Sequence, residues 1–189
     1  MSHSPQLLLL PGLAADERMW RGVLPLLPAA LRPEVATAHQ DVNLHRIEDF
    51  AARLLAQHAG PLVLAGASMG GMGSLMYDRA YPGEADGLVL LAPYLGKRPL
   101  IDEIRRDGLG AWEAGPVPAA VDAGNYQREL WRHLQTWQRD PGRTRTVWLG
   151  YGAQDRLAGA MPPLAGLLPA DHVAVVDGGH AWKVWSPLT

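Results

Sequence analysis

The most constraining feature of this sequence is a glycine-flanked serine that follows an apolar segment. Residues 66–71 read GASMGG, after the apolar residues 61–65 and before residues 72–80, which favour a helix. Ser68, with Gly66 and Gly70 two positions away, fits the G-x-S-x-G pattern of a sharp turn between a strand and a helix. There the glycines allow close backbone contacts, and the helix N-terminus directs N–H groups towards a developing negative charge. The pattern predicts a nucleophilic Ser68; the alternative is a glycine-rich turn with a solvated serine.

The composition sets the limits within which this motif must work. A chain of 189 residues with 48% hydrophobic residues is expected to form one globular domain, residues 1–189. The net charge of −2 and the lack of a Lys or Arg run argue against a nucleic-acid partner. The absence of cysteine excludes disulfides and thiolate metal sites. The N-terminal apolar run, residues 7–10, is too short for a signal peptide or a membrane span, so we expect a cytoplasmic protein without a membrane partner.

Segments typical of strands alternate with segments typical of helices along the chain. Strands are expected at residues 6–10, 33–37, 61–65, 87–92, 144–149 and 173–176. Helices are expected at residues 16–27, capped by Asp16, and between a cap at Asp41 or Asn43 and a stop at Gly60, where residues 47–55 form an apolar face. Further helices are expected at residues 69–81, 101–106, 122–139 and 161–168. This alternation predicts an α/β fold in which a mainly parallel sheet is covered by helices on both faces. In such sheets ligands bind beyond the carboxyl ends of the strands, where the strand order reverses.

The alternation lapses in residues 93–143, which we expect to act as a crossover with a partial lid. Residues 108–119 are rich in Gly, Pro and Ala and are typical of a loop. The helix at 122–139 has Tyr126, Leu130, Leu134 and Trp137 on one side, which favours packing against the body of the protein. Only residues 93–121 remain for a cover, and they lack a continuous apolar face.

A nucleophilic serine needs a base, and the base needs an acid that orients it. His180 lies in a glycine-flanked loop directly after the last expected strand, whereas the other histidines show no such placement and no metal-ligand spacing. Asp155 follows the fifth strand, and Asp177, beside the histidine loop, is the rival acid. We favour Asp155, because a loop on the adjacent strand can face the imidazole directly.

These motifs together resemble the α/β-hydrolase superfamily, whose order of nucleophile, acid and base is matched by Ser68, Asp155 and His180. The resemblance spans nearly the whole chain. It implies that Ser68 is the nucleophile, that His180 is the general base and then acid, and that Asp155 orients it. It further implies an oxyanion hole formed by the backbone N–H groups of Leu13 and Met69, without a metal or cofactor.

The sequence departs from the usual pattern of that superfamily in three ways. There is no room before residue 6 for the two antiparallel strands that many members carry, so a reduced sheet of about six strands is expected. Pro11 stands where a histidine is more usual in the first oxyanion loop, and the segment after His180 is short. These departures concern catalytic efficiency more than the class of reaction.

The resulting hypothesis is a serine hydrolase that cleaves carboxylic esters of small molecules, with short acyl chains, through an acyl-enzyme. Tyr94 and Tyr151 leave strand ends and are expected to line the substrate pocket. Thioester cleavage, amide cleavage or acyl transfer would use the same residues. The alternative from another class is a non-catalytic ligand-binding or interaction protein on a hydrolase scaffold. The sequence makes no prediction about oligomeric state.

Overall fold

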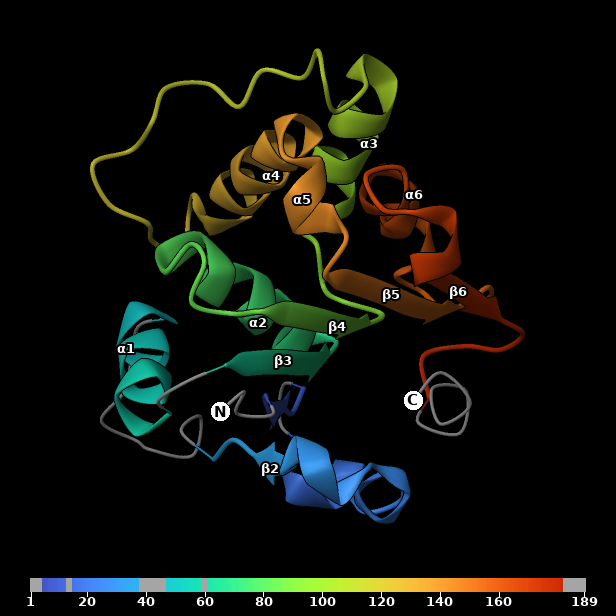
Figure 1. The fold of residues 1–189 in the computed structure, drawn as a ribbon. Coiled ribbons are helices and arrows are strands. Elements are labelled where there is room, and N and C mark those ends of the chain that lie inside the picture. Colours follow the sequence, from blue (N-terminus) through green and yellow to red (C-terminus); the bar gives the residue numbers. More distant parts are fainter. Residues whose placement is uncertain (1–4, 13–14, 38–46, 59–60, 182–189) are drawn as a thin grey trace.

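Six strands form one parallel sheet in the order β2-β1-β3-β4-β5-β6 in the computed structural model, which describes residues 5–12, 15–37, 47–58 and 61–181 (Figure 1). The strands are β1 (Gln6–Leu10), β2 (Glu34–Val35), β3 (Leu62–Ala67), β4 (Gly87–Leu91), β5 (Val147–Gly152) and β6 (Val173–Val176). Strands β3 and β4 are almost continuously apolar because both faces of the sheet are covered. The predicted α/β class and six-stranded parallel sheet are therefore confirmed.

Helices and turns cover the two faces of the sheet unequally. The helices are α1 (Ile47–Gln57), α2 (Met69–Ala80), α3 (Arg98–Asp107), α4 (Tyr126–Thr136), α5 (Pro141–Thr144) and α6 (Met161–Ala165). Helices α2 to α6 lie on one side of the sheet, and the 3-10 turns η1 (Glu17–Trp20), η2 (Leu24–Leu26) and η3 (Ala29–Leu31) lie on the other (Figure 1). Shorter turns are η5 (Trp137–Arg139), η6 (Ala158–Ala160) and η7 (Ala170–His172).

Alternate residues of each strand contribute to two separate hydrophobic clusters. Leu8, Leu64 and Leu88 pack in the larger cluster with α2, α3, α4 and α6. Leu7 and Leu9 pack with the buried Trp20 on the opposite face. In the described part of the chain, no helix has the length and apolar character needed to cross a membrane.

The segment at 16–27, predicted as one helix, forms consecutive 3-10 turns instead. Asp16 caps its start as expected, and its carboxylate accepts a hydrogen bond from Arg18 N at 2.9 Å. Pro25 and Pro28 lack the N–H that an α-helix needs and clash with the preceding turn, so the helix cannot propagate. The two capping residues considered for α1, Asp41 and Asn43, lie outside the described residues.

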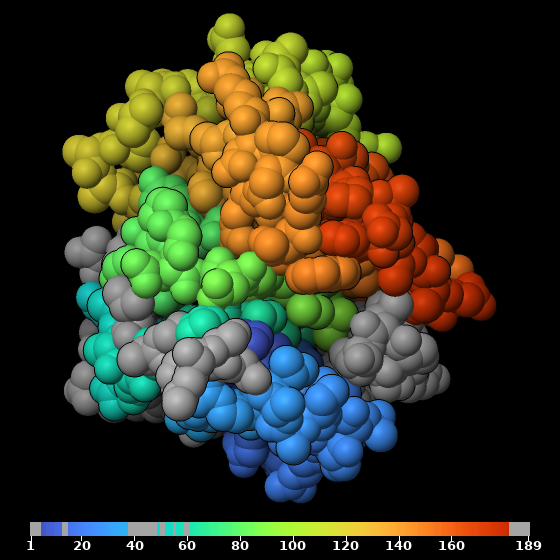
Figure 2. Space-filling view, viewed as in Figure 1, coloured from blue at the N-terminus to red at the C-terminus, as the bar shows by residue number. Residues whose placement is uncertain are grey.

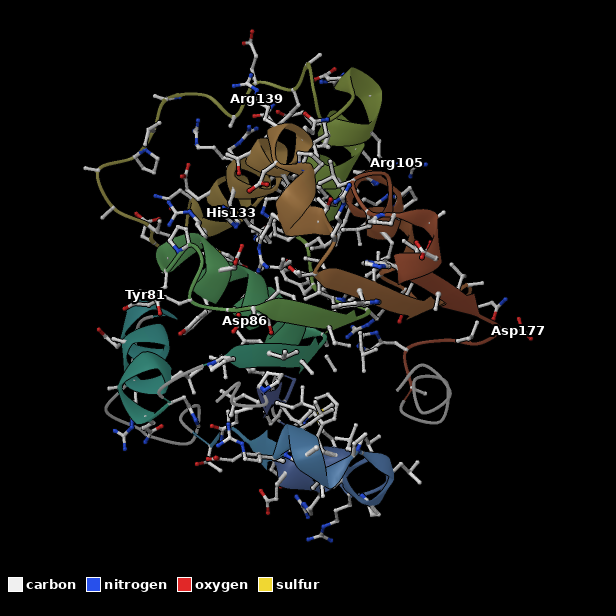
Figure 3. All side chains as sticks on the ribbon, in the orientation of Figure 1. Tyr81, Asp86, Arg105, His133, Arg139 and Asp177 are labelled. Carbon is white, nitrogen blue, oxygen red and sulfur yellow. The ribbon has the colours of Figure 1, made fainter. Side chains whose placement is uncertain are left out.

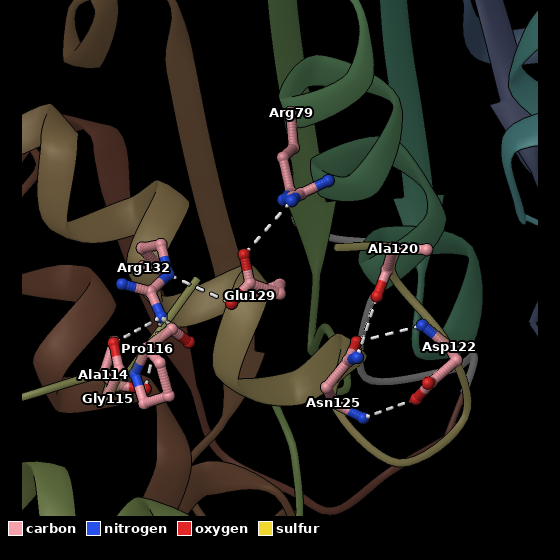
Figure 4. A network of polar contacts seen from close by, with 9 residues as sticks. All are labelled: Arg79, Ala114, Gly115, Pro116, Ala120, Asp122, Asn125, Glu129 and Arg132. Carbon is pink, nitrogen blue, oxygen red and sulfur yellow. Dashed lines mark hydrogen bonds and ion pairs between the residues drawn. The ribbon is translucent and has the colours of Figure 1, made fainter. Parts of the chain in front are cut away.

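The boundaries of α4 and β5 also differ from the expectation. The side-chain oxygens of Asp122 and Asn125 each accept a hydrogen bond from the backbone N–H of the other residue (Figure 4). These residues form a turn, so α4 begins only at Tyr126. Asp140 caps the short α5 and accepts a hydrogen bond from Arg143 N at 3.1 Å. Because α5 occupies residues 141–144, strand β5 begins at Val147 and continues to Gly152.

The long loop before α4 is attached to the body by a buried carboxylate. Glu129 is 2% exposed and binds Arg79 of α2 at 3.2 Å and Arg132 of its own helix at 3.0 Å (Figure 4). Arg132 also donates hydrogen bonds to the carbonyl groups of residues 114–116. This loop, yellow-green in Figure 2, forms part of the outer surface, and its polar anchors hold it against α4.

The strand order reverses between β1 and β3. Strand β1 lies between β2 and β3, so the ends of β1 and β3 are neighbours at the reversal. There the chain after β1 passes over the first turn of α2. A Cβ atom on Gly70 would lie 2.1 Å from Leu10 O and 2.6 Å from Pro11 O.

We predict that Gly70→Ala lowers the free energy of unfolding by about 1–3 kcal/mol or more, because the new methyl group overlaps backbone atoms that cannot rotate away. The matched control is Gly73→Ala in the same helix, where a Cβ atom would meet only Leu10 Cδ2, at an ordinary 3.6 Å. That change should be neutral or stabilise the protein by about 0.5–1 kcal/mol. Urea unfolding measures both; equal effects of the two substitutions would contradict this packing.

Candidate active site

Ser68 occupies a strained backbone conformation between β3 and α2. Its φ of 53° and ψ of −116° fall in a region that non-glycine residues rarely adopt, at a cost of about 1–3 kcal/mol. Ser68 N donates to Leu91 O at 2.9 Å, and Tyr94 N donates to Ser68 O at 2.9 Å. A Cβ atom on Gly66 would lie only 2.2 Å from Gly70 O. The turn predicted from the glycine spacing is therefore present and is held by β4.

The segment after β1 comes close to Ser68. A Cβ atom on Gly12 would lie 3.5 Å from Ser68 Cβ. Leu13, the predicted second donor of an oxyanion hole, lies outside the described residues. Met69, the predicted first donor, is the first residue of α2, where backbone N–H groups have no partner within the helix. The helix dipole adds a partial positive charge at the same place.

His180 and Asp155 are brought together from two different strand ends. The distance between His180 Nδ1 and Asp155 Oδ2 is 2.7 Å, and the side chain of Asp155 is fully buried whereas that of His180 is 16% exposed. An ionised carboxylate can only accept, so His180 Nδ1 donates this hydrogen bond. In the neutral imidazole, Nε2 is then the nitrogen that can accept a proton.

The backbone around Asp155 and His180 is closely packed. A Cβ atom on Gly152 would lie 2.3 Å from Gly178 O, so the end of β5 touches the loop that carries His180. Gln154 N donates to the same Gly178 O at 2.9 Å. The other carboxylate oxygen of Asp155, Oδ1, accepts from Leu157 N at 2.8 Å and fixes the following turn.

Asp177, the rival acid, has a different partner. Its carboxylate accepts a hydrogen bond from Gln154 Nε2 at 2.8 Å, in an exposed position. Figure 3 shows its side chain at the end of β6, directed outward. In this structure the carboxylate bound to His180 is therefore that of Asp155.

A pocket of about 610 Å³ joins Ser68 and His180. Its lining residues are Gly12, Ala15, Met19, Ser68, Met69, Tyr94, Tyr126, Arg156, Leu157 and His180. Of the two tyrosines expected there, Tyr94 lines the pocket and Tyr151 does not. Tyr151 lies within β5, which extends further than predicted, and it packs against the hydrophobic clusters. Within the described ranges, no three His, Asp or Glu side chains gather in a way that could hold a metal ion.

Two lining residues, Tyr126 and Arg156, were not anticipated from the sequence as pocket residues. Tyr126 packs against the large hydrophobic cluster, as expected from its place on the helix, and it also lines the pocket from the first turn of α4. Arg156 is adjacent to Asp155, and that adjacency was the only signal available for it.

The hydroxyl group of Tyr126 is held by a neighbouring amide. Gln127 Nε2 donates a hydrogen bond to Tyr126 Oη at 3.1 Å, while Gln127 Oε1 accepts one from Lys97 N at 2.7 Å. Tyr126 Oη therefore accepts from Gln127, and its own hydrogen is left to donate. Burial raises the pKa of Tyr94, and the neighbouring Tyr126 adds to this shift.

Comparison with protein families places the chain in a known group. Residues 36–188 match the Esterase family model, described as "Putative esterase", and the chain belongs to this family. Among curated proteins, none matches it significantly.

Solved structures share the fold at low sequence identity. An α/β-hydrolase from the metagenome of lagoon sediments at Mar Chica, Morocco, has a TM-score of 0.60 and 18% identity, over 97% of this chain and 85% of that chain. A hydrolase from Oleispira antarctica has a TM-score of 0.58 and 13% identity, over 98% and 89%. Est1E from Butyrivibrio proteoclasticus has a TM-score of 0.57 and 18% identity, over 100% and 84%. The fold is therefore that of the α/β hydrolases, as the sequence motifs suggested.

We predict a strongly deshielded exchangeable proton on His180 Nδ1 in the proton NMR spectrum, because this hydrogen is shared with a buried carboxylate. Asp155→Asn should remove this resonance, and the matched control Asp177→Asn should leave it in place. The His133 ring, whose Nε2 lies 2.8 Å from Asp78 Oδ2, supplies an internal reference in both variants. If the His180 resonance is lost in Asp177→Asn but kept in Asp155→Asn, the partner of His180 is Asp177 and not Asp155.

Proposed function

We propose that the protein is a serine hydrolase that cleaves short-chain carboxylic esters through an acyl-enzyme on Ser68. The observation that carries the proposal is the strained Ser68 at a helix N-terminus, in one pocket with a histidine whose Nδ1 is bonded to a buried carboxylate. Membership in the Esterase family supports the same class of reaction.

In the first half of the reaction, Ser68 Oγ attacks the ester carbonyl carbon while His180 Nε2 takes the hydroxyl proton. The carbonyl oxygen becomes an oxyanion, and the N–H groups of Met69 and Leu13 are proposed to bind it. The bond between the carbonyl carbon and the alcohol oxygen then breaks. His180 returns its proton to the leaving alcohol, and the acyl group remains on Ser68.

In the second half, water replaces the alcohol as the attacking group. His180 accepts a proton from the water, the water oxygen bonds to the acyl carbon, and the proton returns to Ser68 Oγ as the acid is released. Asp155 keeps the imidazole in the correct tautomer and stabilises its charged form throughout. No step requires a group beyond these residues and water.

The pocket walls support a preference for short acyl chains. The segment 93–143 contributes Tyr94 and Tyr126 to the lining, and the residues between them pack elsewhere. Arg132 binds the carbonyl groups of residues 114–116, and these residues are not among the described lining of the pocket. Each buried methylene is worth only about 0.8 kcal/mol, and only where apolar walls enclose it.

We predict that Ser68→Ala reduces ester turnover by on the order of 10⁶-fold, as removal of the nucleophile does in other serine hydrolases. The same change should abolish labelling by a fluorophosphonate probe, and the urea midpoint should remain near that of the wild type. Turnover by a folded, contaminant-free Ser68→Ala protein would refute the assignment of the nucleophile. A wild-type protein that neither reacts with the probe nor cleaves any ester would support the alternative of a non-catalytic binding protein.

We further predict that acyl chains of about two to six carbons give the highest kcat/KM, because longer chains gain no apolar wall. A series of p-nitrophenyl esters, measured below and above the solubility limit of each ester, tests this. An optimum at long chains, or a jump in rate when an emulsion forms, would mean that residues 93–121 act as a cover that opens.

A further inference from the structure

The pocket presents one cationic side chain. Among its described lining residues, apart from the proposed base His180, Arg156 is the one with a charged side chain at neutral pH, and none of them is a carboxylate. The neighbouring carboxylate of Asp155 is not a partner for the Arg156 guanidinium, because it is fully buried and both of its oxygens bind other groups.

Arg156 has no polar partner within the described residues, whereas several other arginines are paired with carboxylates. Arg79, Arg128 and Arg143 bind carboxylates at 3.2, 2.7 and 2.5 Å. Within the described residues, Arg156 has neither a hydrogen bond nor an ion pair, although it faces the pocket. Its five N–H donors are therefore available to a bound molecule.

The backbone of the turn at residues 155–158 fixes where Arg156 leaves the chain, directly beside Asp155. Asp155 Oδ1 accepts from Leu157 N at 2.8 Å, and Ala158 N donates to Asp155 O at 2.9 Å. These two bonds enclose Arg156 in a tight turn directly after the residue that binds His180. The carboxylate that orients His180 thus also positions Arg156 at the pocket wall.

The hydroxyl group of Tyr126 adds a second donor to the same pocket. Tyr126 Oη accepts a hydrogen bond from Gln127 Nε2 at 3.1 Å, so its own hydrogen can be donated to a bound molecule. A guanidinium and a hydroxyl donor in a pocket whose described lining holds no carboxylate are complementary to an anion, and a planar carboxylate matches the guanidinium fork best.

We propose that Arg156 selects esters that carry a second, ionised carboxylate a few bonds from the ester group, with Tyr126 as an auxiliary donor. This inference rests on the proposed function of Ser68 and His180, and it names the class of substrate. Because Arg156 is exposed, solvent screens its charge, so the preference should be moderate and should weaken as salt is added.

The test compares anionic esters with neutral esters of similar shape as substrates of the 189-residue chain. On the acyl side, monoethyl glutarate is compared with ethyl valerate; on the alcohol side, the acetate ester of β-hydroxypropionate is compared with isopentyl acetate. Wild-type protein should have a higher kcat/KM for the anionic member than for the neutral member of at least one pair.

Arg156→Gln should reduce this ratio of anionic to neutral kcat/KM by on the order of tenfold, mainly through KM, as expected for one charge-assisted hydrogen bond. Arg156→Lys should retain part of the preference, and the pair that responds identifies the side of the ester that carries the carboxylate.

The matched control is Arg105→Gln, which removes an arginine of α3 that does not line the pocket, and it should leave both ratios unchanged (Figure 3). If the ratio of anionic to neutral kcat/KM is the same in wild type and Arg156→Gln for both pairs, the inference about Arg156 is overturned. Ester cleavage by these proteins would still support the proposed function.

Calorimetric binding of glutarate to Ser68→Ala protein separates the inference from the proposed function. Binding that weakens about tenfold on adding Arg156→Gln supports the anion site even if no ester is cleaved. Absence of glutarate binding, or binding unaffected by Arg156→Gln, would count against it.

Discussion

The site depends on the close approach of backbone segments around Ser68. A non-glycine residue at φ 53° persists only where its surroundings hold it there. Hydrogen bonds to the end of β4 fix Ser68 N and Ser68 O, and the chain after β1 lies against Gly70. A side chain at Gly66 or Gly70 would force these segments apart. The position of Ser68 above the sheet is thus a consequence of how the ends of β1, β3 and β4 pack.

The carboxylate of Asp155 links two parts of the pocket. One oxygen binds His180 Nδ1, and the other fixes the turn that carries Arg156 and Leu157. Burial of this carboxylate without partners would be costly, and these bonds compensate for its loss of water. The contact between Gly152 and Gly178 brings both strand ends close enough for this to occur. Orientation of the proposed base and placement of the proposed specificity residue therefore share one side chain.

The sequence predicted the fold well because the strands are buried on both faces. Their apolar runs and the glycines around Ser68 are local signals that tertiary packing does not override. The order of strands, with β1 between β2 and β3, comes from the structure. Strand β5 starts late because Asp140 and Pro141 begin a short helix, and it continues to Gly152 through pairing with β6, so Tyr151 lies within the strand and not in the pocket lining.

The roles of Tyr126 and Arg156 required the three-dimensional structure. Tyr126 shares its helical face with buried apolar residues, and its place in the pocket lining together with Tyr94 is visible only in the structure. Arg156 is one arginine among many in the sequence, and what distinguishes it is that it lines the pocket and has no carboxylate partner among the described residues. The spacing of residues in the sequence does not show that either side chain lines the pocket.

The central claim is that Ser68 is a nucleophile with an oxyanion site at the N-terminus of α2. A crystal structure of the protein after reaction with a fluorophosphonate tests it most directly. We expect phosphorus bonded to Ser68 Oγ, with the phosphonyl oxygen about 2.7–3.1 Å from the backbone nitrogens of Met69 and Leu13. An unmodified Ser68, or an adduct whose oxygen points away from both nitrogens, would contradict the account.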